Sequence, residues 1–295
     1  MGESDTVRFR NVLIVPHVRK PGITTMVRQV ASWLEENGVG DCLLESDAEA
    51  LGPDAPGRVV ASLEAVDLAL VLGGDGTMLH AVDVLWGHDI PMVGINIGKL
   101  GFLTAAEIQK VERALEDVFS GRYRVSRRRP IGCKLGTDAS REFRALNEVV
   151  IGKLARERLI HLSTYINGEF FMRYSGDGLI ISSATGSTAY SLSSGGPIVT
   201  PELNCFLLTP ICAHMLFSRP MVLDARDTVK VIVEDAPERL ALSVDGREDV
   251  EIPPGGTVEF FALEKTIKIV ELEGSSFYQT LRRKFMSPPA HVEEE

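Results

Sequence analysis

The stretch Val66–Thr77, VDLALVLGGDGT, decides the fold of the first part of this chain. Its mainly apolar half, Val66–Leu72, ends at two glycines and is typical of a buried strand. A helical pattern follows from Met78 to Trp86. A buried strand that leads through a glycine turn into a helix indicates a parallel sheet with helices on its faces. Sheets of this kind bind ligands at the carboxyl ends of their strands.

The same alternation of strand and helix continues on both sides of this stretch. Val12–Val15 is a short apolar run, and apolar residues then recur at helical spacing from Ile23 until Gly38. Met92–Ile95 is typical of a third strand, and Ile108–Phe119 shows a second amphipathic helical pattern. The chain changes character near residue 122, so the α/β domain is predicted to cover residues 1–122.

Short strands separated by turn residues dominate residues 123–273, which predicts a second, mainly antiparallel β domain. The expected strands are Val149–Ile151, Leu162–Ile166, Leu179–Ser182, Val229–Val233, Leu240–Val244, Val258–Ala262 and Ile267–Val270. Asn167-Gly168 and Asp245-Gly246 are expected turns. The tail, residues 274–295, contains a short amphipathic helix over Phe277–Phe285 that could pack back on the first domain.

The composition argues against several classes of protein. The net charge of −10 speaks against nucleic-acid binding, because phosphate backbones require a basic surface. No apolar run approaches the roughly 18 residues of a membrane helix, and the N-terminus is too polar for a signal peptide. No C-x-x-C pair or zinc spacing is present, so no metal-ligating residue is predicted. A cytoplasmic protein with buried, reduced thiols is expected, at Cys42, Cys133, Cys205 and Cys212.

The pentapeptide Gly73-Gly74-Asp75-Gly76-Thr77 lies between a predicted strand and a predicted helix. The glycines let the backbone come close to a ligand, and the first N–H groups of the helix could hold a phosphate. Asp75 would repel phosphate, but it could orient a hydroxyl group and accept its proton during attack on a phosphoryl group. Asp75 could equally cap the helix that follows. The pentapeptide alone leaves both interpretations open.

Two further motifs carry groups that suit a nucleotide. Asn147-Glu148 offers hydrogen-bond donors and acceptors for ribose hydroxyls or an adenine edge, although taken alone a surface turn is the better interpretation. Gly176-Asp177-Gly178 is followed by Thr185–Pro197, TGSTAYSLSSGGP, which is rich in small residues and hydroxyl groups. Tyr190 within it could stack on a ligand. The non-repetitive order of this stretch argues against a flexible linker.

Taken in order, GGDGT, Asn147-Glu148, GDGLIIS and TGSTAYSLSSGGP resemble the NAD kinase family, as does IGKLGFLT at Ile97–Thr104. The resemblance runs from about Val12 to Phe285. Variants of GGDGT also occur in lipid kinases and phosphofructokinases, whereas TGSTAYSLS together with the other motifs is highly specific. The resemblance implies an α/β Rossmann-like N-terminal domain plus a mainly β C-terminal domain, with an NAD site between them.

The activity implied by the resemblance is transfer of the terminal phosphoryl group of ATP, or of polyphosphate, to the 2′-hydroxyl of the adenosine ribose of NAD. A divalent metal cation, usually Mg²⁺, is implied with ATP as the phosphoryl donor. A homodimer or homotetramer is implied as well.

The resemblance also implies roles for individual residues. Asp75 matches the family's proton acceptor, Gly76 lies beside it at the dinucleotide, and Asp177 matches the acid at the nicotinamide end. Asn147 and Glu148 match the pair that holds the nicotinamide-side ribose or a neighbouring group. Further ligand contacts are implied at His80, Arg158, Ser175, Thr185, Thr188, Ala189, Tyr190, Ser191, Leu192, Ser193, Cys212 and Arg247, and a phosphate loop at Gly73, Gly74, Gly76 and Thr77.

The chain departs from the family pattern at two places. Ser183-Ala184 stands where Thr-Pro is frequent, and Arg247 stands where glutamine is frequent, so an arginine could reach a phosphate there. Two other functions remain open: a lipid or sugar kinase, which the TGSTAYSLS loop disfavours, and a non-catalytic dinucleotide sensor, which Asp75 disfavours. Arg127–Arg129 is interpreted as a solvated strand edge rather than an anion site.

Overall fold

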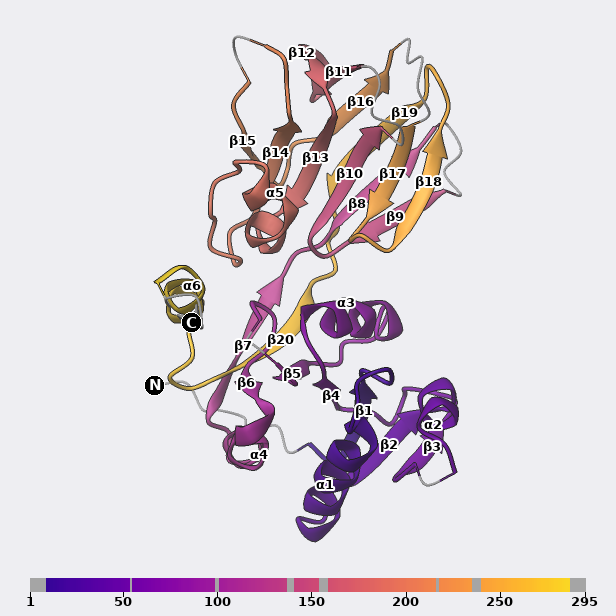
Figure 1. The fold of residues 1–295 in the computed structure, drawn as a ribbon, viewed down its shortest axis with the longest axis vertical. Helices are drawn as coiled ribbons and strands as arrows, with labels where there is room; N and C mark the ends of the chain where they lie inside the picture. The colour runs from indigo at the N-terminus through magenta and orange to yellow at the C-terminus, as the bar shows by residue number, and fades with distance from the viewer. Residues whose placement is uncertain are drawn as a thin grey trace, which may run out of the picture. The chain divides into compact units, whose positions relative to one another are not determined.

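The computed structural model describes residues 9–53, 55–98, 101–136, 141–153, 159–215, 218–234 and 240–286. The chain divides into two compact units, one formed by Met1–Ser126 with Lys268–Glu295 and the other by Arg127–Ile267. The chain therefore returns to the first unit at Lys268, whereas sequence analysis extended the second domain to residue 273. The predicted fold class, an α/β domain followed by a mainly β domain, is confirmed (Figure 1).

The first unit contains an eight-stranded sheet in the order β3-β2-β1-β4-β5-β20-β7, with β6 paired to β5. Its strands are β1 (Asn11–Pro16), β2 (Gly40–Leu44), β3 (Arg58–Val60), β4 (Leu68–Leu72), β5 (Met92–Asn96), β6 (Ala106–Glu107), β7 (Tyr123–Arg128) and β20 (Ile267–Leu272). Its helices are α1 (Ile23–Glu36), α2 (Glu45–Leu51), α3 (Asp75–Val84), η1 (Ile108–Lys110), α4 (Val111–Phe119) and α6 (Phe277–Met286).

The centre of this sheet is parallel, because β1 pairs in parallel with both β2 and β4, and β4 pairs in parallel with β5. Alternate residues of β4, including Leu68 and Leu70, share one core with the apolar stripes of α1 and α4. Trp33 of α1 packs against Phe119 of α4 with ring centroids 5.6 Å apart. The apolar periodicity of these two helices thus covers one face of the sheet, as an amphipathic stripe requires.

The second unit contains two six-stranded sheets, in the orders β15-β14-β13-β10-β17-β18 and β12-β11-β16-β19-β8-β9. The strands are β8 (Ile131–Leu135), β9 (Glu142–Ala145), β10 (Glu148–Lys153), β11 (Ile160–Ile166), β12 (Glu169–Gly176), β13 (Gly178–Ser183), β14 (Cys205–Ile211), β15 (Met221–Asp224), β16 (Val229–Val233), β17 (Leu240–Val244), β18 (Glu248–Ile252) and β19 (Thr257–Ala262). Their recorded pairings are antiparallel, and one apolar core draws residues from both sheets.

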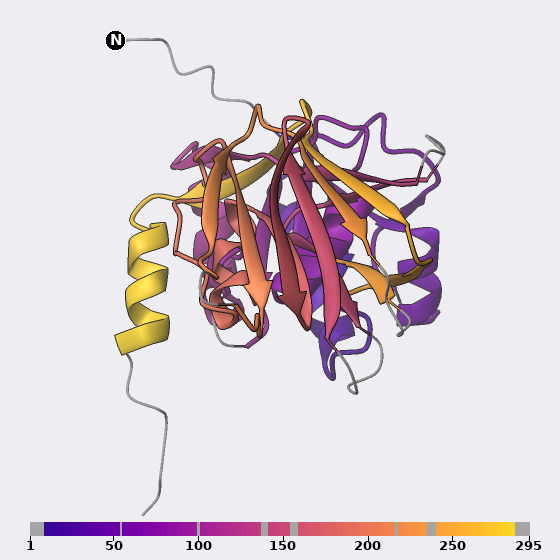
Figure 2. The same cartoon turned by 90° about the horizontal axis from the view of Figure 1, so that it is seen from above.

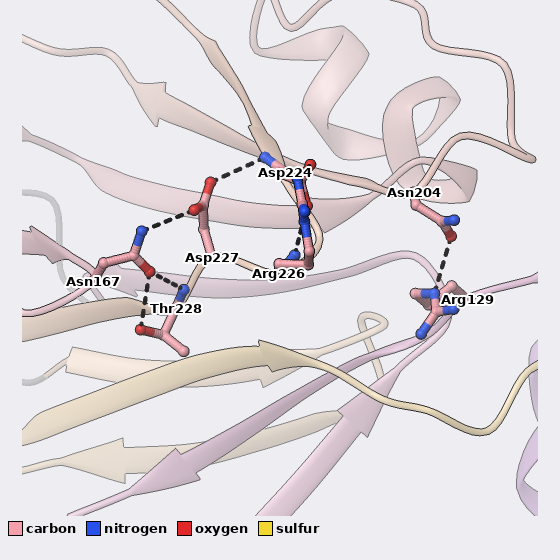
Figure 3. Close-up of polar contacts among 7 residues, drawn as sticks. All are labelled: Arg129, Asn167, Asn204, Asp224, Arg226, Asp227 and Thr228. Carbon is pink, nitrogen blue, oxygen red and sulfur yellow. Dashed lines mark hydrogen bonds and ion pairs between the residues drawn. The ribbon is translucent and has the colours of Figure 1, made fainter.

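Polar side chains tie the turns of the second unit together (Figure 3). Asn167, in the predicted Asn167-Gly168 turn, donates to Asp227 Oδ1 at 2.8 Å and accepts the Thr228 N–H at 2.9 Å. Asp227 Oδ2 accepts the N–H of Asp224 at 3.0 Å. These bonds join the β11–β12 turn to the β15–β16 turn. Asn167 and Gly168 have positive φ values of 52° and 83°, as a two-residue hairpin turn of this kind requires.

Two smaller predictions fail in the structure. Arg128 is buried, with 4% of its surface exposed. Arg129 donates to Asn204 Oδ1 and to the Leu263 carbonyl, each at 3.0 Å. The arginine run is therefore not simply a solvated edge, because its members face in different directions along a strand. All four cysteines are free, but Cys205 is only half-buried and Cys212 is exposed, so only Cys42 and Cys133 are buried as predicted.

Candidate active site

The GGDGT loop joins β4 to α3 in the first unit. A Cβ atom on Gly73 would lie 2.2 Å from Thr77 Oγ1, so no other residue fits at this position without a rearrangement. The Gly74 carbonyl accepts the N–H groups of Thr77 and Met78 at 3.0 and 3.1 Å, and Gly74 is the N-cap of α3. The loop therefore turns at once from a buried strand into a helix whose first N–H groups, including that of exposed Gly76, can meet a ligand.

Asp75 is the first residue of α3, and no side-chain hydrogen bond caps this helix. The interpretation of Asp75 as a helix cap is therefore wrong. Its carboxylate instead accepts the backbone N–H groups of Phe102 at 2.9 Å and Leu103 at 3.0 Å. A Cβ atom on Gly101 would lie 1.9 Å from Asp75 Oδ1. A carboxylate has about four lone-pair positions, so this half-buried group keeps acceptor capacity for a substrate hydroxyl.

The loop after β1 lies beside the GGDGT loop, because the His17 N–H donates to the Leu72 carbonyl at 2.8 Å. This loop carries two exposed cations, Arg19 and Lys20, ahead of α1. The chain proceeds from β1 outward to β2, while β4 lies on the other side of β1. The two loops therefore meet at a topological switch point, the place where open α/β sheets bind ligands.

His80 lies exposed on α3. Its charge acts on Asp47 of α2, a buried carboxyl group whose pKa is raised by desolvation and lowered by His80. His80 and Asp75 both lie on α3, five residues apart.

In the second unit, Asn147 and Glu148 are held by Asp245. The Asp245 carboxylate accepts the N–H groups of Leu146, Asn147 and Glu148 at 2.9, 2.9 and 3.0 Å. The Asp245 N–H donates in return to the Glu148 carbonyl at 2.9 Å. Asp245 lies in the tight β17–β18 turn, where it and Gly246 have positive φ values of 47° and 66°. Arg247 lies 3.4 Å from Asp245 Oδ2.

Glu148 is buried, and the pKa of its carboxyl group is raised to about 7, mainly by desolvation and also by the nearby charge of Asp245. A hydrogen bond from the Tyr190 backbone acts on this pKa in the opposite direction. Glu148 Oε2 has no hydrogen-bond partner in the structure. At neutral pH this group can therefore act as an acceptor or, when protonated, as a donor toward a ligand.

The TGSTAYSLS loop forms two short helices, η2 (Thr185–Thr188) and α5 (Tyr190–Ser193), at the same end of this unit. A Cβ atom on Gly186 would lie 2.2 Å from the Asn147 carbonyl oxygen, so glycine lets the loop approach. Ser183 Oγ bridges the two motifs, because it donates to the Leu146 carbonyl at 2.5 Å and accepts the Gly186 N–H at 3.2 Å.

The side chains of this loop divide between anchoring and exposed positions. Ser191 Oγ is buried and pairs with Thr209 Oγ1 at 2.9 Å, so it anchors the loop. Thr185 is buried too, whereas Thr188, Ala189 and Leu192 are half-buried. Tyr190 and Ser193 are exposed, and the Tyr190 side chain has 45% of its surface free. The loop is thus ordered, as predicted for a binding loop rather than a linker.

A second group of predicted residues lies beyond the other end of β10: Asp177 precedes β13 and Cys212 follows β14 in the same sheet, whereas Ser175 belongs to β12 of the other sheet. Asp177 forms an ion pair with Lys153 at 2.6 Å and donates its N–H to Ile211. Ser175 Oγ lies 2.8 Å from His161 Nδ1, and exposed Cys212 follows Ile211. Gly152, which pairs with Gly178, is four positions along β10 from Glu148, so the two groups are about 14 Å apart along the strand.

The remaining expectations from the sequence concern Arg158, metal ligands and membrane-spanning helices. Arg158 lies outside the described residues. Within the part of the chain that the structure describes, no group of three or more His, Cys, Asp or Glu side chains could hold a metal ion. In the same part, no helix is long and apolar enough to cross a membrane.

Sequence reasoning did not single out Asp245, Ser183 or the N–H groups of Phe102 and Leu103 as parts of the site. The turn pair Asp245-Gly246 and the IGKLGFLT motif were visible, but their partners lie 97–99 and 27–28 residues away in sequence.

Two models of protein families match this chain. Residues 58–123 match the ATP-NAD kinase N-terminal domain, and residues 146–272 match the ATP-NAD kinase C-terminal domain. The chain belongs to the NAD kinase family. The NAD kinase of Moorella thermoacetica is 33% identical over 288 residues, which are 97% of this chain and 93% of that protein. The NAD kinase of Geobacter metallireducens is 36% identical over 281 residues, which are 94% and 98% of the two chains.

Two solved structures share the fold at 24% identity. The crystal structure of yeast NADH kinase complexed with NADH aligns with a TM-score of 0.84 over 98% of this chain and 91% of that chain. The crystal structure of an NAD kinase from Archaeoglobus fulgidus in complex with ATP aligns with a TM-score of 0.72 over 93% and 98%. These likenesses confirm the two-unit NAD kinase fold.

Proposed function

We propose that this protein phosphorylates the 2′-hydroxyl of the adenosine ribose of NAD with ATP and so forms NADP. The observation that carries this proposal is Asp75. It is an aspartate at the start of a helix, held by two backbone N–H groups at the carboxyl edge of a parallel sheet, in a chain of the NAD kinase family.

In this proposal Asp75 orients the ribose hydroxyl and accepts its proton. The hydroxyl oxygen forms a bond to the γ-phosphorus of ATP while the bond to the β-phosphate oxygen breaks, so ADP leaves and the proton remains on Asp75. Positioning and charge stabilisation supply most of the rate in such transfers, with a positioned base adding to it. The fixed carboxylate of Asp75 suits this role.

The donor phosphates are proposed to lie over the GGDGT loop. Gly74 and Gly76 leave room there, and the first N–H groups of α3 favour an anion. Arg19 and Lys20 bring positive charge to the same switch point. This charge counteracts the repulsion between the Asp75 carboxylate and the donor phosphates. The structural relative from Archaeoglobus fulgidus was solved with ATP. Mg²⁺ prefers phosphate oxygens and water, so the ATP phosphates themselves would hold it, and it would supply neutralisation of the phosphate charge.

The dinucleotide is proposed to contact both groups of residues in the β unit. Asn147, Glu148 and the loop from Thr185 to Ser193 offer donors and acceptors at one end, and Arg247 adds a cation. Asp177, Ser175 and Cys212 offer polar groups at the other end. The yeast relative was solved with NADH, so NADH is tested beside NAD as the acceptor of the phosphoryl group.

We further propose a homodimer or homotetramer in the cytoplasm. The β unit exposes large apolar side chains at Phe170, Ile198, Leu203 and Val222, and β12 and β15 are edge strands that need cover. A neighbouring copy could also bring its Asp177 group to the Asn147–Glu148 group of this chain. Four free cysteines fit a reducing compartment.

The direct test incubates purified protein with ATP, Mg²⁺ and NAD, and measures NADP through an NADP-specific dehydrogenase. Parallel reactions replace ATP with polyphosphate, NAD with NADH, and NAD with a lipid acceptor. NADP formation that requires both ATP and NAD supports the proposal. Phosphorylation of the lipid acceptor without NADP formation would overturn it, and tight NAD binding without turnover would indicate a sensor.

A further inference from the structure

The C-terminal helix α6 contacts the loop that holds Asp75. Phe102 donates its N–H to the Asp75 carboxylate, and its ring faces the Phe277 ring of α6 with centroids 6.0 Å apart. Lys284 Nζ lies 4.9 Å from the centroid of the same Phe102 ring. One residue therefore connects the proposed catalytic base to the last described element of the chain.

Phe277 and Lys284 lie seven residues apart, so they project from the same face of α6, two turns from each other. The packing of α6 is loose beside this face, since Gln279, Thr280 and Arg283 line a cavity of about 410 Å³ shared with α4. None of residues 277–285 is buried. Figure 2 shows α6 as a yellow coil reached through a single connection. The aromatic contact of Phe277 and the cation–π contact of Lys284 with Phe102 therefore attach α6 to the loop that holds Asp75.

The rest of the loop is anchored without α6. Leu103 is buried, with 4% of its surface exposed, and the Ala105 N–H donates to the Gly94 carbonyl of β5 at 2.7 Å. The Gly101 N–H donates to Thr104 Oγ1 at 3.0 Å. The Phe102 ring is only half-buried, and α6 supplies its recorded ring contacts. Removing α6 contacts should therefore free Phe102 while the loop's other end stays in place.

We propose that α6 positions Asp75 for catalysis, with Phe277 and Lys284 as positioning residues that act through Phe102. This inference rests on the proposed function. When Phe102 shifts, one of the two N–H groups that orient the Asp75 carboxylate shifts with it. Displacement of a reacting group by about 1 Å can cost about a hundredfold in rate. Because Phe277 and Lys284 would act on the orientation of the Asp75 carboxylate through Phe102, we expect the affinity for NAD to stay unchanged.

The test compares Phe277→Ala with Phe285→Ala, a second aromatic residue of α6 that is 58% exposed. We expect Phe277→Ala to lower kcat by about tenfold to a hundredfold with an unchanged KM for NAD. Phe285→Ala should leave kcat unchanged. Lys284→Gln should lower kcat in the same direction, whereas its neighbour Arg283→Gln should not. Lys284 and Arg283 are exposed, so this second pair keeps the test valid if Phe277→Ala fails to fold.

The decisive measurement repeats Phe277→Ala in an Asp75→Asn background. If α6 acts through the Asp75 carboxylate, the residual kcat of Asp75→Asn does not fall further, because residues acting as a unit are non-additive. An equal fall in both backgrounds means a merely structural role and overturns the inference. A low kcat for Asp75→Asn beside a normal kcat for Phe277→Ala overturns this inference alone. A normal kcat for Asp75→Asn overturns the base assignment, and this inference with it.

Discussion

Glu148 shows how one residue can report on the site through pH. Its pKa is raised to about 7 from an ordinary value of 4.5, because burial disfavours the charged carboxylate. The folded state therefore binds more protons at this group than the unfolded state does between these two pH values. Folding stability must fall as pH rises through this window, by on the order of 3 kcal/mol at most.

Glu148→Gln should remove this pH dependence, since an amide has the shape of the protonated acid and does not ionise. We expect the melting temperature of the variant to exceed that of the parent at pH 8 and to approach it at pH 5. Thermal unfolding at both pH values gives the difference. Glu259→Gln, at an exposed position of β19, is the matched control. A variant-to-parent difference that is equal at pH 5 and pH 8 would contradict the assignment.

Gly101 tests the geometry around Asp75 at the same scale. A Cβ atom at Gly101 would lie 1.9 Å from Asp75 Oδ1, whereas a Cβ atom at nearby Gly98 would meet only Asn96 Oδ1 at an ordinary 3.8 Å. Gly101→Ala must therefore displace the carboxylate, and we expect kcat to fall by about a hundredfold. Gly98→Ala should keep its kcat. Steady-state kinetics of both variants, with circular dichroism to verify folding, decide the matter; equal kinetics would show that the Asp75 position is unimportant.

At the scale of elements, the strands and helices with strong local patterns were predictable. β1, β4, β5, α1 and α4 follow from apolar runs and helical stripes that neighbouring residues determine. β2 and β14 were missed because Asp41 and Pro210 interrupt their apolar runs. α3 begins at Asp75, three residues earlier than expected, because Gly74 and not a side chain ends the preceding turn.

The TGSTAYSLS loop is the element on which the proposed NAD site depends most. Ala189 is half-buried between η2 and α5, so a large side chain there should fill the space offered to the dinucleotide. We expect Ala189→Trp to raise the apparent KM for NAD strongly, with a melting temperature close to that of the parent. Val59→Trp, at an exposed position of β3 in the first unit, should change neither value. An unchanged KM in Ala189→Trp would remove this loop from the site.

At the scale of the whole molecule, the sequence offered candidate site residues but could not show which of them lie together. Asp75 and its N–H donors are 27 and 28 residues apart, and Asp245 reaches back 97–99 residues to the Asn147–Glu148 backbone. Such pairings depend on tertiary packing, which no local pattern encodes. For the same reason the sequence could not show that Asp177 and Glu148 lie at opposite ends of one sheet.

This separation bears on assembly. We expect a dimer or tetramer by light scattering at micromolar concentration, because edge strands and exposed apolar residues of the β unit require cover. If a neighbour completes the site, Asp177→Ala and Glu148→Ala variants, each weakly active, should regain activity when unfolded together and refolded as mixed oligomers. A monomer of 32.2 kDa with full activity would contradict this expectation.

The central claim is that Asp75 is the base that activates the ribose hydroxyl of NAD. Asp75→Asn keeps the size and shape of the side chain but removes the proton acceptor, and its amide nitrogen replaces one of the two oxygens that accept the backbone N–H groups of Phe102 and Leu103. The measurement pairs kcat for NADP formation with calorimetric titration of NAD into the same variant, and Asp83→Asn on the same helix is the control. We predict that kcat falls by at least about a hundredfold while NAD still binds. A near-normal kcat would contradict the claim, and loss of NAD binding would show that Asp75 mainly holds the substrate.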